Sequence, residues 1–316
     1  MLREVFVVAL VLVALGASPA AAKDPPLSVP AAQLRAALAC RPTFEHPDRN
    51  PVLLVHGTAI TPEESWDWNY AKALPAAGYD VCWVRLPDRA LGDIQVASEY
   101  VVYAIRRIHR LSGRKLTVIG HSQGGIEPRW ALRWWRGARR AVDDYIGLAS
   151  PNHGVAGADV CASSGNCWPA VWQMASRSHF LAALNSRDET PGRVSYTSLF
   201  SETDELVQPF TRVPLTGGAN TANIRVQDLC PGRYVHHVGM IEDVVVYDLV
   251  LDAMTHPGPA DPARVRRAAC FGTFMPYVTM GTAFKGNMRL YGNAAKAFYQ
   301  HPGTRQEPPL APYARG

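Results

Sequence analysis

The chain has 316 residues, of which 47% are hydrophobic and 19% are charged, so it is an ordinary globular protein able to bury a large core. Its formal net charge of +5 is mild and is spread over isolated arginine pairs, which argues against a nucleic-acid-binding protein. The sequence contains no internal repeat and no low-complexity linker. We therefore expect one α/β domain over residues 23–316.

Residues 1–22 are typical of a secretory signal peptide. A short charged start precedes an apolar stretch at 5–16, and the small residues 20–22 offer a cleavage site before Lys23. The apolar stretch is too short for a comfortable membrane span, and no later segment suggests a transmembrane anchor. We therefore expect a secreted, extracellular protein.

Apolar runs bounded by polar residues alternate with stretches of helical periodicity along the chain. The expected strands cover residues 51–55, 80–84, 114–119, 145–149, 194–200 and 224–226. The expected helices cover residues 67–77, 94–111, 125–135 and 240–254, the last of these being the final long helix. The proline- and glycine-rich tail after Thr255 is expected to wrap the surface. Strands that alternate with helices predict a mostly parallel sheet with helices on both faces.

The pentapeptide Gly120-His121-Ser122-Gln123-Gly124 stands between a predicted strand and a predicted helix. A strand, a G-x-S-x-G turn and a helix together form a nucleophile elbow, a tight turn that lifts a serine hydroxyl above the sheet. The glycines are needed because a side chain at either position would collide with a neighbouring strand or helix. Ser122 is therefore the candidate nucleophile of an α/β-hydrolase fold.

A serine nucleophile needs a histidine base and an acid that holds the base, and in this fold the chain order is serine, acid, histidine. The first acidic loop after a strand beyond the serine offers three acids that the sequence alone does not separate: Glu202, Asp204 and Glu205. For the base, the pair His236-His237 follows an extended stretch and precedes a helix, which is the expected position.

Acyl transfer also needs donors for the developing oxyanion, each worth about 3 to 4 kcal/mol when well placed. In a nucleophile elbow, the main-chain N–H of the residue after the serine, here Gln123, supplies one donor. The loop after an earlier strand supplies the other, and the segment His56-Gly57-Thr58-Ala59 occupies that position. Thr58 and Gln123 are therefore the expected oxyanion-hole residues.

Six cysteines in an exported chain predict three disulfides. Chain order and proximity favour the pairs Cys40–Cys82, Cys161–Cys167 and Cys230–Cys270. The spacing of Cys161 and Cys167 lacks the companion ligands of a zinc site, so we expect no bound metal.

Residues 155–185 interrupt the alternation of strands and helices and are rich in large apolar side chains. Such an inserted segment is typical of a lid or an acyl-binding wall, although a helical cap packed in the core is an equally good interpretation. In either case an apolar acyl chain is the expected ligand. The residues expected to line the substrate pocket are His121, Asn152, Trp172 and Met174.

Three blocks of the sequence, residues 122–125, 171–173 and 199–209, resemble those of the Candida antarctica lipase B-like lipases of the α/β-hydrolase superfamily. The resemblance extends from Cys40 to residues 312–315. Within that family the T-D-E-x-V-Q-P block carries the triad acid, which implies that Asp204 has this role.

The same resemblance implies further roles. The family's base stands in an H-x-G context, which matches His237, and its oxyanion threonine, a donor of both N–H and hydroxyl, matches Thr58. The pairings Cys40–Cys82 and Cys230–Cys270 also agree with the family. Gly120 and His121 depart from it, because the family lipase has a threonine and a tryptophan there, so its stereochemical preference does not carry over.

These observations predict a secreted serine carboxylic-ester hydrolase, a lipase or esterase, that acts through a Ser-His-Asp triad and an acyl-enzyme. We expect an ester or lipid substrate, met at a lipid–water interface, and a monomer without cofactor, metal ion or nucleic-acid partner. An acyltransferase or polyester depolymerase on the same triad is the alternative. A non-catalytic binding protein of this fold is disfavoured because all three triad residues are present.

Overall fold

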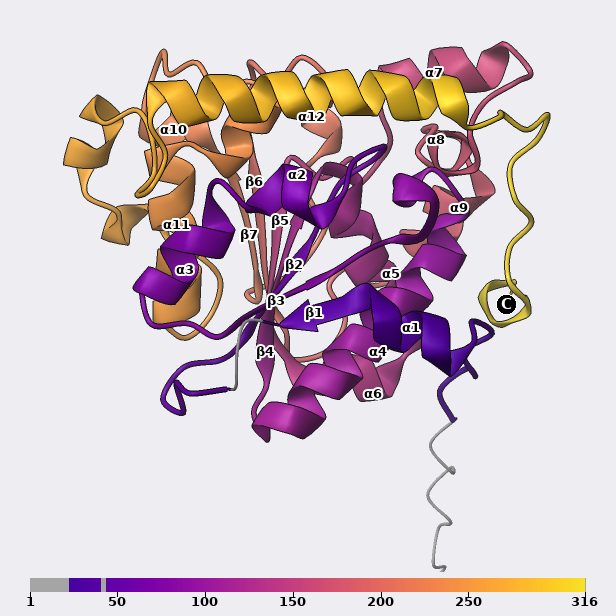
Figure 1. Ribbon diagram of the computed structural model, residues 1–316, viewed down its shortest axis with the longest axis horizontal. Helices are drawn as coiled ribbons and strands as arrows, with labels where there is room; N and C mark the ends of the chain where they lie inside the picture. Colours follow the sequence, from indigo (N-terminus) through magenta and orange to yellow (C-terminus); the bar gives the residue numbers. More distant parts are fainter. Residues whose placement is uncertain (1–22, 41–43, 316) are drawn as a thin grey trace, which may run out of the picture.

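Seven strands form one sheet in the computed structural model, which describes residues 23–40 and 44–315 (Figure 1). Their order is β1-β3-β2-β4-β5-β6-β7; β1 is antiparallel to β3, and every other neighbouring pair is parallel. The strands are β1 (Leu38–Cys40), β2 (Val52–Val55), β3 (Val81–Val84), β4 (Leu116–His121), β5 (Val142–Leu148), β6 (Ser195–Phe200) and β7 (Thr221–Arg225). The mostly parallel sheet expected from the sequence is confirmed. The expected signal peptide lies outside the described residues.

Helices cover both faces of this sheet. They are α1 (Ala31–Ala37), α2 (Pro62–Trp66), α3 (Tyr70–Ala76), α4 (Ile94–Ser112), α5 (Ile126–Trp134), α6 (Arg136–Ala141), α7 (Ala156–Ser163), α8 (Pro169–Gln173), α9 (His179–Leu184), α10 (Val226–Leu229), α11 (Val244–Thr255) and α12 (Met280–Gln300). Figure 1 shows α3 and α11 on one side of the strands and α4, α5 and α6 on the other.

The strand β2 shows why both faces are covered. All its side chains are buried, and they alternate between two apolar cores. Leu53 and Val55 pack in the core that contains α4 and α5, whereas Val52 and Leu54 pack in the core that contains α3 and α11. A strand apolar on both faces is the pattern of a parallel sheet between two helical layers.

The expected helix at 67–77 is observed as α3, which begins at Tyr70, and the short helix α2 that precedes it was not expected. The caps explain both boundaries. Thr61 begins α2 with a capping box, because its side chain accepts from the N–H of Glu64 and the Glu64 side chain accepts from the N–H of Thr61. Asn69 then breaks the helix with φ −136° and ψ −106°, and its side chain accepts from the N–H of Tyr70 to begin α3.

The expectation that 240–254 is the final long helix is wrong. The 21-residue helix α12 lies in the tail that was expected only to wrap the surface, and it crosses one end of the molecule beside α2 (Figure 1). Three glycines lower its intrinsic helix propensity and so mask it in the sequence. One of them, Gly286, is required by packing, since a Cβ there would lie 2.5 Å from the Trp68 ring.

Residues 155–185 contain the helices α7, α8 and α9. Phe180 of α9 stacks on Trp130 of α5 with ring centroids 4.4 Å apart, and Leu181 and Leu184 are buried beside them. The end of the segment is thus part of the core on the α5 face. Its start lines the cavity described below.

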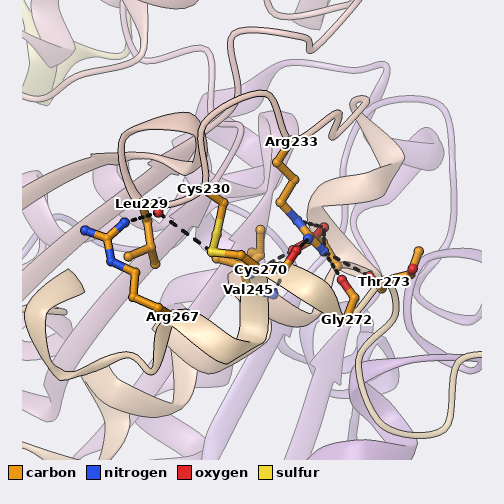
Figure 2. Close-up of a disulfide and its surroundings, with 10 residues drawn as sticks. Leu229, Cys230, Arg233, Val245, Arg267, Cys270, Gly272 and Thr273 are labelled. Carbon is orange, nitrogen blue, oxygen red and sulfur yellow. Dashed lines mark hydrogen bonds and ion pairs between the residues drawn. A yellow bond between two sulfur atoms is a disulfide. The ribbon is translucent and has the colours of Figure 1, made fainter.

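Three disulfides join the expected pairs, Cys40–Cys82, Cys161–Cys167 and Cys230–Cys270. Figure 2 shows Cys230–Cys270, which joins the end of α10 to the segment before α12. Beside it, Arg233 donates to the main-chain carbonyls of Cys270, Gly272 and Thr273 at 3.1, 2.9 and 3.2 Å (Figure 2). The disulfide and the arginine together tether the loop between α10 and α11.

The disulfides close loops of different lengths, so we expect them to contribute differently to the free energy of unfolding. Cys230–Cys270 spans 40 residues and Cys161–Cys167 spans 6. By loop entropy, removing the first should lower the free energy of unfolding by about 4 kcal/mol and removing the second by about 2 kcal/mol. Denaturant unfolding of Cys230→Ala/Cys270→Ala and of Cys161→Ala/Cys167→Ala, without reductant, measures both. Equal losses in the two variants would contradict the prediction.

Candidate active site

The residues singled out by the sequence lie at the carboxyl ends of β2, β4 and β6. Thr58 follows β2, Ser122 follows β4, and Asp204 lies in the loop after β6. Because these strands are parallel, their carboxyl ends meet at one edge of the sheet, which is where open α/β sheets bind ligands. His237, in the loop between α10 and α11, joins them there through its contact with Asp204.

The turn that carries Ser122 is tight on every side. Ser122 has φ +57°, in the left-handed region that non-glycine residues rarely adopt. A Cβ on Gly57 would lie 3.0 Å from the Cβ of Ser122, and a Cβ on Gly120 or Gly124 would overlap main-chain atoms. The serine is therefore held in the strained strand-to-helix turn of a nucleophile elbow.

A buried hydrogen bond joins His237 to Asp204. The Nδ1–H of His237 donates to Asp204 Oδ2 at 2.8 Å, which leaves Nε2 free to accept a proton. Asp204 Oδ1 accepts from the N–H groups of Leu206 and Val207, each at 2.8 Å. Burial alone would raise the pKa of Asp204, but the imidazole and these N–H groups outweigh burial and lower the pKa below its ordinary value.

The other two acids left open by the sequence make different contacts. Glu202 pairs with Arg225 at 3.0 Å on the surface. Glu205 accepts from the main-chain N–H of His237 at 2.8 Å and from the hydroxyl of Tyr291 at 2.5 Å. Asp204 is thus the acid that bonds the imidazole, while Glu205 bonds the backbone of the same residue.

The neighbouring histidine, His236, faces another acid. Its Nε2 lies 3.3 Å from Glu242, and its Nδ1 accepts from the N–H of Gly239 at 3.2 Å. The hydrogen bond to Glu242 raises the pKa of His236 above its ordinary value. Of the two histidines, His237 is the one aimed at the edge of the sheet that carries Ser122.

His56 fixes the loop after β2. Its Nε2 accepts from the N–H of Leu86 at 3.0 Å, and its Nδ1 donates to the carbonyl of Gly57 at 2.9 Å. Burial lowers the pKa of His56 to about 4, so the ring is neutral at neutral pH and supplies one acceptor and one donor. The loop that carries Thr58 is therefore anchored to the end of β3.

The side chain of Gln123 connects Thr58 to Glu127. The Thr58 hydroxyl donates to Gln123 Oε1 at 2.5 Å, and Gln123 Nε2 donates to Glu127 Oε1 at 2.7 Å and to the carbonyl of Ala90 at 3.0 Å. In the described part of the chain, the main-chain N–H of Thr58 has no acceptor.

A cavity of about 560 Å³ opens at Ser122 and His237. Its polar lining also includes Thr58 and Tyr291, and the rest of the lining is mostly apolar: Ile60, Val155, Ala158, Trp168, Val171, Met174, Leu206, Val207, Leu290, Ala294, Ala295 and Phe298. His121 and Met174, both expected in the pocket, belong to this lining. His121 also donates from Nε2 to the carbonyl of His237 at 3.1 Å, and burial lowers its pKa to about 3.

The expected pocket positions of Asn152 and Trp172 need correction. Asn152 is fully buried, where its side chain accepts from Arg129 at 3.3 Å and donates to the carbonyl of Val213 at 2.7 Å. Trp172 donates its indole N–H to the carbonyl of Thr304 at 3.0 Å. Neither side chain is part of the cavity lining. Each is instead hydrogen-bonded to a residue that is distant in the sequence.

Sequence reasoning missed the contribution of α12 to this cavity. Leu290, Tyr291 and Phe298 of α12 form one wall. The available signal was the helical spacing of Leu290, Ala294 and Ala297. Glu127 was also missed, and its position four residues after Gln123 on a helix was the sign that the two side chains meet.

Residues 23–40 and 44–315 contain neither a metal-binding cluster nor a membrane-spanning helix. Within these ranges, no group of three or more histidine, cysteine or acidic side chains is arranged to hold a metal ion. In the same ranges, no helix combines the length and the hydropathy needed to cross a membrane.

Comparison with known proteins gives consistent results. Residues 49–249 match the family described as Lipase (class 2). Lipase B of Pseudozyma antarctica is 32% identical over 302 residues, which cover 92% of this chain and 87% of that protein. The crystal structure of Aspergillus fumigatus lipase B superposes with a TM-score of 0.87 at 31% identity, covering 93% of this chain and 74% of that one. Bacillus licheniformis lipase BlEst2, in its propeptide form, shares the fold at 20% identity and a TM-score of 0.58, over 71% of this chain and 54% of that one.

The carboxyl of Glu127 predicts a pH-dependent stability. Burial raises its pKa to about 8, above the ordinary value of 4.5, so its contribution to stability is full below 4.5 and is lost as the pH rises through about 8. Glu127→Gln keeps the acceptor for Gln123 and carries no titratable group. The free energy of unfolding of this variant, relative to the wild type, should therefore increase between pH 5 and pH 9.

Denaturant unfolding at a series of pH values measures this difference. Glu202→Gln, which removes an acid from the surface, is the matched control and should follow the wild-type pH profile. Parallel profiles for Glu127→Gln and the wild type would contradict the prediction.

Proposed function

The chain belongs to the class 2 lipase family, and from this premise we propose that it hydrolyses carboxylic esters through Ser122, His237 and Asp204 as nucleophile, base and acid. The observation that carries the proposal is the buried Asp204–His237 hydrogen bond beside the cavity that Ser122 lines. The family match and the similarity to two B-type lipases identify this chain as a serine ester hydrolase of the lipase or esterase class.

In the first half-reaction, Ser122 Oγ attacks the ester carbonyl carbon while His237 Nε2 takes the hydroxyl proton. Asp204 keeps the imidazole in the tautomer that has Nδ1–H and stabilises the imidazolium that forms. The carbonyl oxygen, now negative, accepts from the N–H groups of Thr58 and Gln123 and from the Thr58 hydroxyl, which must turn from Gln123 Oε1 to reach it.

The tetrahedral intermediate then collapses. The C–O bond to the alcohol breaks, His237 gives its proton to the leaving alkoxide, and the acyl group stays on Ser122. Water enters, loses a proton to His237 and attacks the acyl carbon. The acid product leaves as the proton returns to Ser122 Oγ, so the residues end as they began.

The cavity supports esters with an apolar acyl group as substrates. Its walls away from Ser122 and His237 carry aliphatic and aromatic side chains, including Met174, Leu290 and Phe298. A charged acyl chain would lose its hydration there without gaining a partner. A lipid or other apolar ester is therefore the favoured substrate class.

Export is supported by the three disulfides, since disulfides persist in oxidising compartments.

Replacement of the proposed acid tests the triad. Asp204→Asn should lower kcat for p-nitrophenyl butyrate by about 10⁴-fold, because the amide favours the wrong tautomer of His237. Ser122→Ala should abolish labelling by a phosphonate probe, which forms a covalent bond with an activated serine hydroxyl. The wild type should also hydrolyse p-nitrophenyl esters of medium and long acyl chains, because most of the cavity lining is apolar.

Two controls sharpen the test. Glu202→Gln, in the same loop but paired with Arg225, should keep the wild-type kcat within about threefold, as expected for a surface change. Circular dichroism of Asp204→Asn should match that of the wild type. A folded Asp204→Asn variant with unchanged kcat would remove Asp204 from the mechanism.

A further inference from the structure

The helix α12 leaves an apolar stripe uncovered on its outer side. Met280, Phe284 and Met288, one helical turn apart in succession, are 76%, 68% and 62% exposed. Tyr291 and Ala295 continue the stripe, and both are exposed. Contiguous exposed apolar residues of this size mark an interaction surface.

This stripe leads into the cavity. Tyr291 and Ala295 belong both to the stripe and to the lining of the cavity, and Phe298 continues the lining one turn further along α12. Leu206, in the loop after β6, also lines the cavity and is 50% exposed. The outer face of α12 and the entrance to Ser122 therefore form one continuous apolar surface.

A second, cationic stripe runs along α12 beside the apolar one. It consists of Lys285, Arg289 and Lys296, all exposed, at positions i, i+4 and i+11 of the helix. In the described part of the chain none of the three forms a hydrogen bond or an ion pair with another side chain. Residues 280–300 contain no aspartate or glutamate, so no acid on α12 offsets these charges.

Three acids from other elements accept hydrogen bonds from neutral side chains of α12. Asn287 donates to Glu242 at 3.0 Å, and Asn293 donates to Glu64 at 2.6 Å. Tyr291 donates to Glu205 at 2.5 Å. These acids thus bond neutral side chains of α12, while the three cations of the helix remain exposed to solvent.

We propose that the outer face of α12 docks this protein on an anionic lipid surface, with the apolar stripe in the acyl boundary and the cationic stripe at the headgroups. A helix with adjacent apolar and cationic faces lies in the plane of a membrane surface and favours anionic lipids. A second copy of the chain is a poor occupant, because its α12 would bring like charges together. The inference rests on the proposed function, since it names the surface that supplies esters to the same cavity.

Vesicle binding tests the inference without hydrolysis. The full chain carrying Ser122→Ala is titrated with vesicles of phosphatidylcholine alone and of phosphatidylcholine with about a third phosphatidylglycerol, at about 0.15 M salt. The anionic vesicles should bind more tightly. Lys285→Gln/Arg289→Gln/Lys296→Gln should lose about fivefold in affinity per cation, or about 100-fold in total, for the anionic vesicles alone.

A matched control removes three exposed arginines from α4 and α6, at the other end of the molecule from α12 (Figure 1): Arg110→Gln/Arg136→Gln/Arg140→Gln. This control has the same net charge as the α12 variant and should bind as the parent does. Phe284→Ser/Met288→Ser should weaken binding to both kinds of vesicle.

Three results would overturn the inference: equal binding to neutral and anionic vesicles, an equal loss in the control, or no loss in Phe284→Ser/Met288→Ser. Self-association of the chain through the same two residues would also overturn it. Hydrolysis of p-nitrophenyl butyrate by the α12 charge variant, with Ser122 intact, should equal that of the wild type. Failure of the wild type to hydrolyse this soluble ester would instead contradict the proposed function and leave the vesicle result valid.

Discussion

The position of His237 is the constraint on which the rest of the site depends. The residue lies in a loop between α10 and α11 that has only a short 3-10 turn of its own, so tertiary contacts must fix the imidazole. Asp204 bonds the ring, Glu205 bonds the main-chain N–H and His121 bonds the main-chain carbonyl. Cys230–Cys270 and Arg233 tether the same loop from outside (Figure 2). These tertiary contacts fix the loop in place of the regular secondary structure that it lacks.

The contact between Tyr291 and Glu205 couples this loop to α12. Glu205 accepts from Tyr291 on one oxygen and from the N–H of His237 on the other, so a single carboxylate bonds both the cavity wall and the backbone of the proposed base. Burial would raise the pKa of Glu205, but these hydrogen bonds outweigh burial and keep the pKa below its ordinary value. A displacement of α12 would therefore alter the support of His237 as well as the opening of the cavity.

Much of the fold could be predicted because local signals agreed with the tertiary structure. The helix expected at 94–111 is observed as α4, since Asp93 caps its start and Gly113, at φ +69°, ends it. The helix α12 could not be predicted in the same way. Its three glycines lower its helix propensity, and at Gly286 the reason is close packing against Trp68, a residue too far away in the sequence to leave a local signal.

The site residues divide in the same way, into those that local sequence signals predict and those that only tertiary contacts determine. The order of serine, acid and histidine, together with the strand before each loop, narrowed the candidates to a few residues. The choice among Glu202, Asp204 and Glu205 depends on which side chain points at His237, and in a loop without regular structure neither spacing nor periodicity determines that direction. The pocket positions of Asn152 and Trp172 needed correction for a similar reason, because each side chain bonds a partner from a remote segment.

Burial of two histidines near the reacting groups has a consequence for catalysis. The rings of His121 and His237 have centroids 4.7 Å apart, and proton transfer from Ser122 would make His237 positive. A charged His121 at that distance would oppose the transfer by repulsion. Because burial lowers the pKa of His121 to about 3, its ring stays neutral while its Nε2–H still holds the carbonyl of His237. The site thus gains a positioning contact without a competing charge, and Asp204 remains the charged neighbour bonded to the imidazolium.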